Sequence, residues 1–79
     1  MSVSAREFQL LQYFIEHAET TLSRGQLLTD VWGYNAKIFT RTVDVHVASL
    51  RHKLEDDPKQ PTFIQTVQRA GYKFTPTRA

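Results

Sequence analysis

The sequence has no cysteine, only three glycines and three prolines, and no long run of apolar residues. Without cysteine, neither a disulfide framework nor a thiolate metal site can form. No apolar stretch approaches the roughly 20 residues that a membrane-spanning helix needs. A chain of 79 residues buries only about 60% of its unfolded surface, so its core is small. We expect one soluble, intracellular domain over residues 1–79.

Few residues in the sequence suggest a metal site or a catalytic site. Three histidines remain as possible metal ligands, but His46 and His52 are six residues apart and would not share a helical face. Asp44 and His46 are two residues apart, so their side chains would diverge on a helix. No Gly-rich phosphate loop and no nucleophile–base–orienter set is evident. We expect no metal, no cofactor and no enzymatic activity.

The net charge of +2 is distributed unevenly along the chain. Residues 1–30 contain two basic and four acidic residues, whereas residues 31–79 contain eight basic and four acidic residues. A polyanion would dock on the basic half. Small domains also show such asymmetry by chance, so charge alone does not establish a nucleic-acid partner.

The apolar spacing predicts three helices, over about 4–18, 23–32 and 40–55. The pairs Ser4–Glu7 and Ser23–Gln26 have the spacing of capping boxes, and Thr40 is the N-cap candidate of the third helix. Residues Thr21-Leu22 form a short extended link. The third helix has one apolar stripe, formed by Val43, Val47, Leu50 and Leu54.

A β-hairpin over about 63–75 follows the helices, and Tyr72 and Phe74 share one of its faces. The order helix, helix, helix, hairpin predicts a mostly α, α+β fold. This fold is a winged helix-turn-helix, in which three helices are followed by a C-terminal hairpin wing. Winged helices bind DNA, but they also serve as protein-interaction modules.

The face of the third helix opposite the apolar stripe carries little charge. An ordinary solvated face would carry Lys, Glu and Gln, whereas this face carries Arg41, Val45, Ala48, Ser49 and His52. Small residues allow close approach to a major groove, where Val45 or Ala48 could touch a thymine methyl and Arg41 could hold a phosphate. Packing of Val45 and Ala48 under a neighbouring loop is the alternative.

The hairpin tip carries Arg69, with no acidic residue anywhere from 58 to 79. An arginine at a wing tip can enter a narrow minor groove, where the negative potential is focused. A solvated arginine at a turn is an equally simple interpretation.

Several motifs in a fixed order resemble the C-terminal effector domain of OmpR/PhoB-type response regulators. The resemblance covers about residues 4–75, nearly the whole chain. Its motifs are Glu7–Leu11, Ser23–Leu28, Val31–Gly33, Arg41–Val47, Leu50–Leu54, Ile64–Val67 and Gly71–Phe74.

The resemblance implies sequence-specific binding of double-stranded DNA for transcription regulation, as the output domain of a cytoplasmic two-component response regulator. It implies tandem or dimeric binding to promoter direct repeats and contact with RNA polymerase. It also implies a receiver domain, outside this chain, that a sensor kinase phosphorylates. The recognition helix over 40–54 would lie in the major groove. The wing over 67–73 would lie at the minor groove or the DNA backbone.

The resemblance also assigns roles by matching position. The phosphate-side contacts would be Arg41, Thr42 and His46. The groove-facing or base-edge positions would be Asp44, Val45, Ser49 and Arg51, beside Ala48. The backbone anchors would be Trp32, Thr66 and Tyr72, and the wing contacts would be Gln68 and Arg69. The polymerase-contact loop would comprise Tyr34, Asn35, Ala36, Lys37, Ile38 and Phe39.

Three departures from the family pattern affect these expectations. Ala48 and Ser49 stand where family members often have basic residues, and Arg69 stands where the turn usually has glycine. The small sheet that precedes the first helix in the family would be missing, which leaves Leu10 and Tyr13 as candidates for exposure or pairing. The lost basic positions keep open the alternative of a protein–protein interaction module with weak or no DNA binding.

Overall fold

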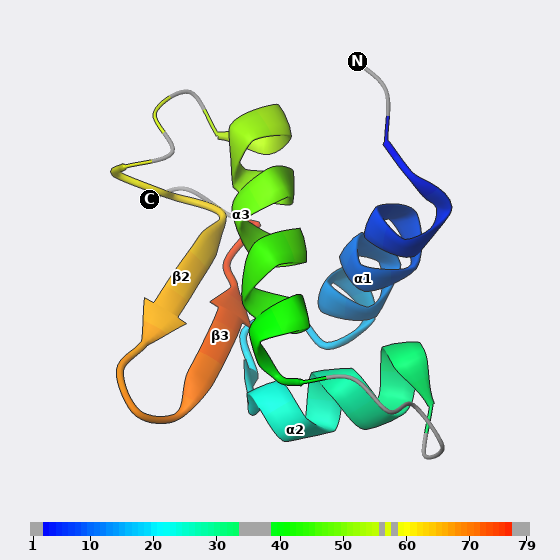
Figure 1. Cartoon of the computed structure of the whole chain (residues 1–79). Helices are drawn as coiled ribbons and strands as arrows, with labels where there is room; N and C mark the ends of the chain where they lie inside the picture. The colour runs from blue at the N-terminus through cyan, green and yellow to red at the C-terminus, as the bar shows by residue number, and fades with distance from the viewer. Residues whose placement is uncertain (1–2, 34–38, 56, 58, 77–79) are drawn as a thin grey trace.

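A computed structural model describes residues 3–33, 39–55, 57 and 59–76 of the chain. Figure 1 shows α3 at the centre, with α1 on one side, the β2–β3 hairpin on the other and α2 beneath. The predicted winged helix-turn-helix fold is confirmed, with one additional strand. The elements in chain order are α1 (Ala5–Glu16), β1 (Thr21–Leu22), α2 (Arg24–Leu27), the π-helical turn η1 (Leu28–Trp32), α3 (Arg41–Leu54), β2 (Ile64–Val67) and β3 (Gly71–Phe74).

The additional strand is β1, whose two residues were expected to form only a link. It pairs antiparallel with β3, and Leu22 lies opposite Tyr72. The other edge of β3 pairs antiparallel with β2, so the sheet order is β1-β3-β2. Side chains alternate between the two faces of a strand. Tyr72 and Phe74 therefore share the buried face, as predicted.

The N-terminal caps of the helices agree in part with those predicted from the sequence. Ser4 and Glu7 form the predicted capping box, in which each backbone N–H donates to the other side chain. Ser23 Oγ accepts from the Gln26 N–H at 2.9 Å, so the Ser half of the second pattern is present. Thr40 is the N-cap residue of α3, as predicted. Its backbone is already helical and, in the described part of the chain, its hydroxyl makes no capping bond.

The core lies where α1, α3 and the sheet meet. The α3 stripe is buried through Val43, Val47 and Leu50, while Leu54 is half-buried. Aliphatic and aromatic residues of the other elements complete this core, and they are Leu10, Phe14, Leu22, Leu27, Ile64, Tyr72 and Phe74.

The exposed apolar face of α1 is not the one expected. Leu10 is fully buried, so its predicted exposure is wrong, and Tyr13 is half-buried with its hydroxyl bonded to Asp30. Leu10 lies on the buried face of α1, whereas Phe8 and Ile15 are 59% and 56% exposed. No helix of the described residues has the length and hydrophobicity to cross a membrane.

The buried carboxylate of Glu7 joins the start of α1 to the second half of α3. Its Oε1 accepts from Lys53 Nζ at 2.6 Å, and Ser49 Oγ donates to its Oε2. The hydrogen bonds from Lys53, Ser49 and Ser4 outweigh the effect of burial and lower the pKa of Glu7 to about 2. The ionised form therefore stabilises the contact between α1 and α3.

This contact makes stability depend on pH. An unfolded Glu7 titrates near 4.5 and the folded one near 2, so the unfolded state binds the proton more tightly. The stabilisation is present above pH 4.5 and is lost as the pH falls toward 2. Glu7→Gln should lower the free energy of unfolding by about 2 kcal/mol near neutral pH. That free energy should then fall less than in wild type as the pH is lowered. Urea unfolding at a series of pH values measures both effects. Equal pH dependence in both proteins would contradict this role.

Candidate nucleic-acid interface

The outward face of α3 is exposed and carries little charge. Arg41, Val45, Ala48 and His52 are all exposed, and the Val45 side chain is 59% exposed. Within the described residues no neighbouring loop buries Val45 or Ala48. Ser49 was expected to face the groove, but its hydroxyl donates to Glu7 of α1. The outward surface therefore consists of small apolar groups between Arg41 and His52.

Asp44 connects three elements. Its Oδ1 accepts from the Tyr72 hydroxyl of β3 at 2.7 Å, and its Oδ2 accepts from Arg24 Nη1 of α2 at 3.1 Å. Burial and the hydrogen bond to Asp44 raise the pKa of Tyr72 to about 12, so the hydroxyl keeps its proton. Asp44 thus fixes the start of α3 relative to the wing. In this arrangement both of its oxygens are engaged by protein groups.

Arg51 connects α3 to β2. Its Nη2 donates to the Ile64 carbonyl at 2.8 Å and to Thr66 Oγ1 at 2.7 Å, and its Nε donates to the same carbonyl at 3.1 Å. Its guanidinium carbon lies 5.5 Å from the Tyr72 ring centroid, within the range of a cation–π contact. The structure thus brings together Arg51, Thr66 and Tyr72, which were predicted separately as DNA contacts.

A second cluster lies where η1 meets the start of α3. The Trp32 ring contacts the His46 ring edge-on, with centroids 5.1 Å apart, and the Arg6 guanidinium lies 5.4 Å from the Trp32 ring. His46 Nδ1 lies 2.8 Å from the Thr42 carbonyl oxygen, which can only accept. Nδ1 therefore carries the proton of this bond, and no hydrogen bond engages Nε2 among the described residues.

The wing tip lies beside the start of α2. Gln68, Arg69 and Ala70 are exposed, and Arg69 has φ 65°, in the left-handed region that favours glycine. In the loop predicted to contact polymerase, Phe39 is 85% exposed. The rest of that loop, residues 34–38, lies outside the described residues.

Arg24 is the residue of this surface that sequence reasoning missed. Its sequence context placed it in a capping pattern and a family motif but gave it no role in binding. In the structure it is exposed and pairs with Asp44, twenty residues further along the chain. A contact between two separate helices has no signature in local spacing. Only the fold brings Arg24 to the same surface as Arg69.

The helix-turn-helix, the exposed face of α3 and the adjoining wing define a winged-helix domain of the DNA-binding transcription-regulator class. The model of the family described as "Transcriptional regulatory protein, C terminal" matches residues 1–74. The chain belongs to this family.

Relatives agree with this assignment. The chain is 46% identical over 76 residues to the transcriptional regulatory protein YvrH of Bacillus subtilis, covering 96% of the chain and 32% of YvrH. It is 42% identical over 74 residues to the sensory transduction protein RegX3 of Mycolicibacterium smegmatis, covering 94% of the chain and 32% of RegX3. The chain therefore spans about a third of the length of the curated relatives that it matches.

Solved structures agree as well. The response regulator DrrB of Thermotoga maritima, an OmpR/PhoB homologue, superposes with a TM-score of 0.86 at 32% identity, over 94% of the chain and 33% of DrrB. The DNA-binding domain of Klebsiella pneumoniae RstA, solved in complex with the RstA box, superposes with a TM-score of 0.84 at 34% identity. That match covers 96% of the chain and 75% of the RstA domain.

Proposed function

We propose that the chain binds double-stranded DNA sequence-specifically to regulate transcription, as the non-catalytic output domain of a response regulator. The observation that carries the proposal is the outward face of α3, where Val45 and Ala48 are exposed between Arg41 and His52. A major groove admits an α-helix, and small apolar side chains can contact thymine methyl groups there.

The remaining surface supports the same orientation. With α3 in the major groove, Gln68 and Arg69 of the wing reach the minor groove or the backbone. Arg41, Thr42 and His46 form the phosphate-side contacts at the start of α3, and Trp32 is a backbone anchor beside them. Asp44, Arg51, Thr66 and Tyr72 bond the wing to the helix and belong to the same proposed interface.

The wider role follows from the family and rests on the longer relatives. We propose a receiver domain phosphorylated by a sensor kinase, tandem or dimeric binding to promoter direct repeats, and a cytoplasmic location. RNA polymerase would contact the loop over 34–39, of which Phe39 is the described and exposed residue.

The test is selection from a pool of duplexes randomised over about 20 base pairs, two helical turns. We expect one sequence to be enriched and to bind with an affinity that falls steeply with salt. Arg41→Ala should weaken binding by about 1–3 kcal/mol and lower the slope of log affinity against log salt by about one. Fluorescence anisotropy at several salt concentrations measures both.

Lys59→Ala is the matched control, because Lys59 is exposed and follows the end of α3 opposite to Arg41. It removes the same charge and should change affinity much less than Arg41→Ala. If the folded domain bound no duplex at low salt, DNA binding would be overturned. If it bound without enriching any sequence, the specificity would be overturned.

A further inference from the structure

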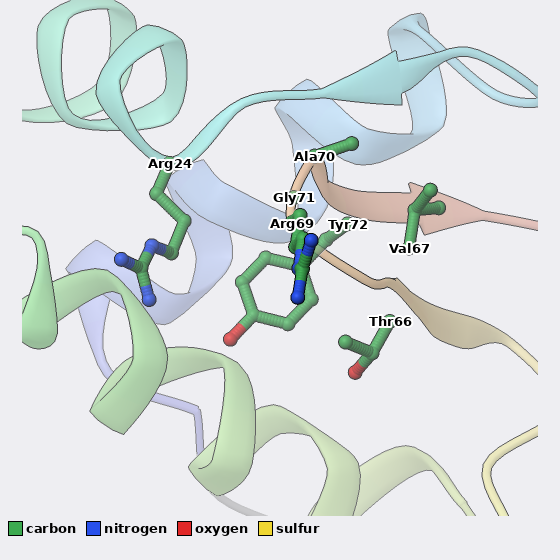
Figure 2. Close-up of a pocket in the computed structure, with 7 residues that line it drawn as sticks. All are labelled: Arg24, Thr66, Val67, Arg69, Ala70, Gly71 and Tyr72. Carbon is green, nitrogen blue, oxygen red and sulfur yellow. The ribbon is translucent and has the colours of Figure 1, made fainter.

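A cleft separates the first turn of α2 from the wing tip. Figure 2 shows Arg24 on one side of it, with Arg69, Thr66 and Tyr72 on the other. Its volume of about 210 Å³ is several times the ~30 Å³ that one water molecule takes up in the liquid. The cleft therefore has room for a small hydrated ionic group.

The charged side chains that line the cleft are both arginines, Arg24 and Arg69, and both are exposed. Arg69 adopts φ 65°, a conformation that costs a non-glycine residue about 1 kcal/mol or more and that glycine adopts freely. Backbone strain of this kind is often kept where a side chain has a function. The strain at Arg69 therefore points to a use for its side chain in the cleft.

Arg24 pairs with Asp44, whose Oδ2 lies 3.1 Å from Arg24 Nη1. The two side chains are 51% and 33% exposed, and exposed pairs of this kind are worth only about 0–1 kcal/mol. A guanidinium has five N–H donors, so this pair leaves other donors of Arg24 available. Arg24 can therefore bind a second anion while Asp44 orients it.

We propose that this cleft binds one phosphate group of the DNA backbone, held by Arg24 and Arg69. The inference rests on the proposed function and adds Arg24 to the interface. Guanidinium groups hold phosphate oxygens through paired, charge-assisted hydrogen bonds. A phosphate here would lie between the groove that α3 enters and the groove that the wing approaches. It would fix the register of both elements on the duplex.

The experiment compares Arg24→Gln and Arg69→Asn with wild type on one duplex of arbitrary sequence and on the selected one. Asparagine tolerates the left-handed backbone, so Arg69→Asn removes the charge without adding strain. Each variant should bind about three- to tenfold more weakly at low salt, equally on both duplexes. Each should lower the salt slope by about one. Arg24→Lys and Arg69→Lys should restore most of the affinity.

Lys59→Gln is the charge-matched control, and circular dichroism melting checks that every variant is folded. If Arg24→Gln and Arg69→Asn bound the duplexes as tightly as Lys59→Gln while wild type bound DNA, the cleft proposal would fail and the proposed function would stand. If folded wild type bound no duplex, both would fail.

A separate arm tests free phosphate as the occupant. Inorganic phosphate is titrated into the protein while the side-chain Nε–Hε signals of Arg24 and Arg69 are followed by NMR. Shifts of both signals, together with weakened duplex binding by the variants, support a phosphate site that DNA occupies. Shifts without any loss of duplex binding in the variants would assign the cleft to a free anion and overturn the proposal.

Discussion

Gly71→Ala is expected to lower the free energy of unfolding by about 3 kcal/mol or more. A Cβ at this position would collide with the Leu22 carbonyl, which is main chain and cannot rotate away. Gly71 also has φ 145°, which alanine rarely adopts. Since Leu22 pairs with Tyr72, relieving the clash would pull β1 away from β3 and open the core at Leu22, which is fully buried.

Thermal unfolding followed by circular dichroism measures this effect. For a domain of this size, 3 kcal/mol corresponds to a fall in Tm of more than about 12 °C. Gly25→Ala is the matched control, because nothing lies within 4 Å of a Cβ there and the residue is helical. It should be neutral or stabilise by up to about 1 kcal/mol. If Gly71→Ala had the same Tm as Gly25→Ala, the close contact between Gly71 and the Leu22 carbonyl would be wrong.

The second large effect is expected at Glu55, whose carboxylate is buried just after α3. It accepts from the backbone N–H groups of Thr62, Phe63 and Ile64, each at 2.9 Å. Burial raises the pKa of Glu55, but the hydrogen bonds from Ile64, Thr62 and Phe63 outweigh it and lower that pKa below its ordinary value. One side chain thus anchors the start of β2 to the end of α3.

Glu55→Ala should destabilise the domain by about 2–4 kcal/mol, because the buried Ile64 N–H loses its acceptor. Asp57→Ala is the control in the same loop. Within the described residues, its exposed carboxylate accepts only from the Lys59 N–H. Asp57→Ala should therefore lower the free energy of unfolding by less than about 1 kcal/mol. Urea unfolding near neutral pH measures both. Equal losses in the two variants would show that Glu55 does not anchor β2.

Local patterns predicted most of the fold. The α3 stripe, the Ser4–Glu7 capping box and the shared face of Tyr72 and Phe74 depend on residues a few positions apart, so spacing alone reveals them. The strand β1 was missed because its two residues pair with β3, about fifty positions away. A link of two residues carries no periodicity from which a strand could be recognised.

The candidate site was predictable only as a set of residues on α3 and the wing. The sequence identified Asp44, Arg51 and Thr66 as site residues but did not show how they are bonded. Arg51 bonds to Thr66, and Asp44 bonds to Tyr72 and Arg24, and each of these bonds joins two separate elements. The family resemblance suggested that Ser49 faces the groove. The structure instead directs its hydroxyl to Glu7, which no local pattern relates to it.

The residues of α3 fall into three sets with separate tasks, and this separation bears on how such domains diverge. Val43, Val47 and Leu50 pack the core, while Asp44, Ser49 and Arg51 bond to other elements. Within the described residues, neither role is taken by the outward positions Arg41, Val45, Ala48 and His52. Substitutions there leave folding largely intact, so paralogues built on this framework can acquire new operators by changing a handful of codons.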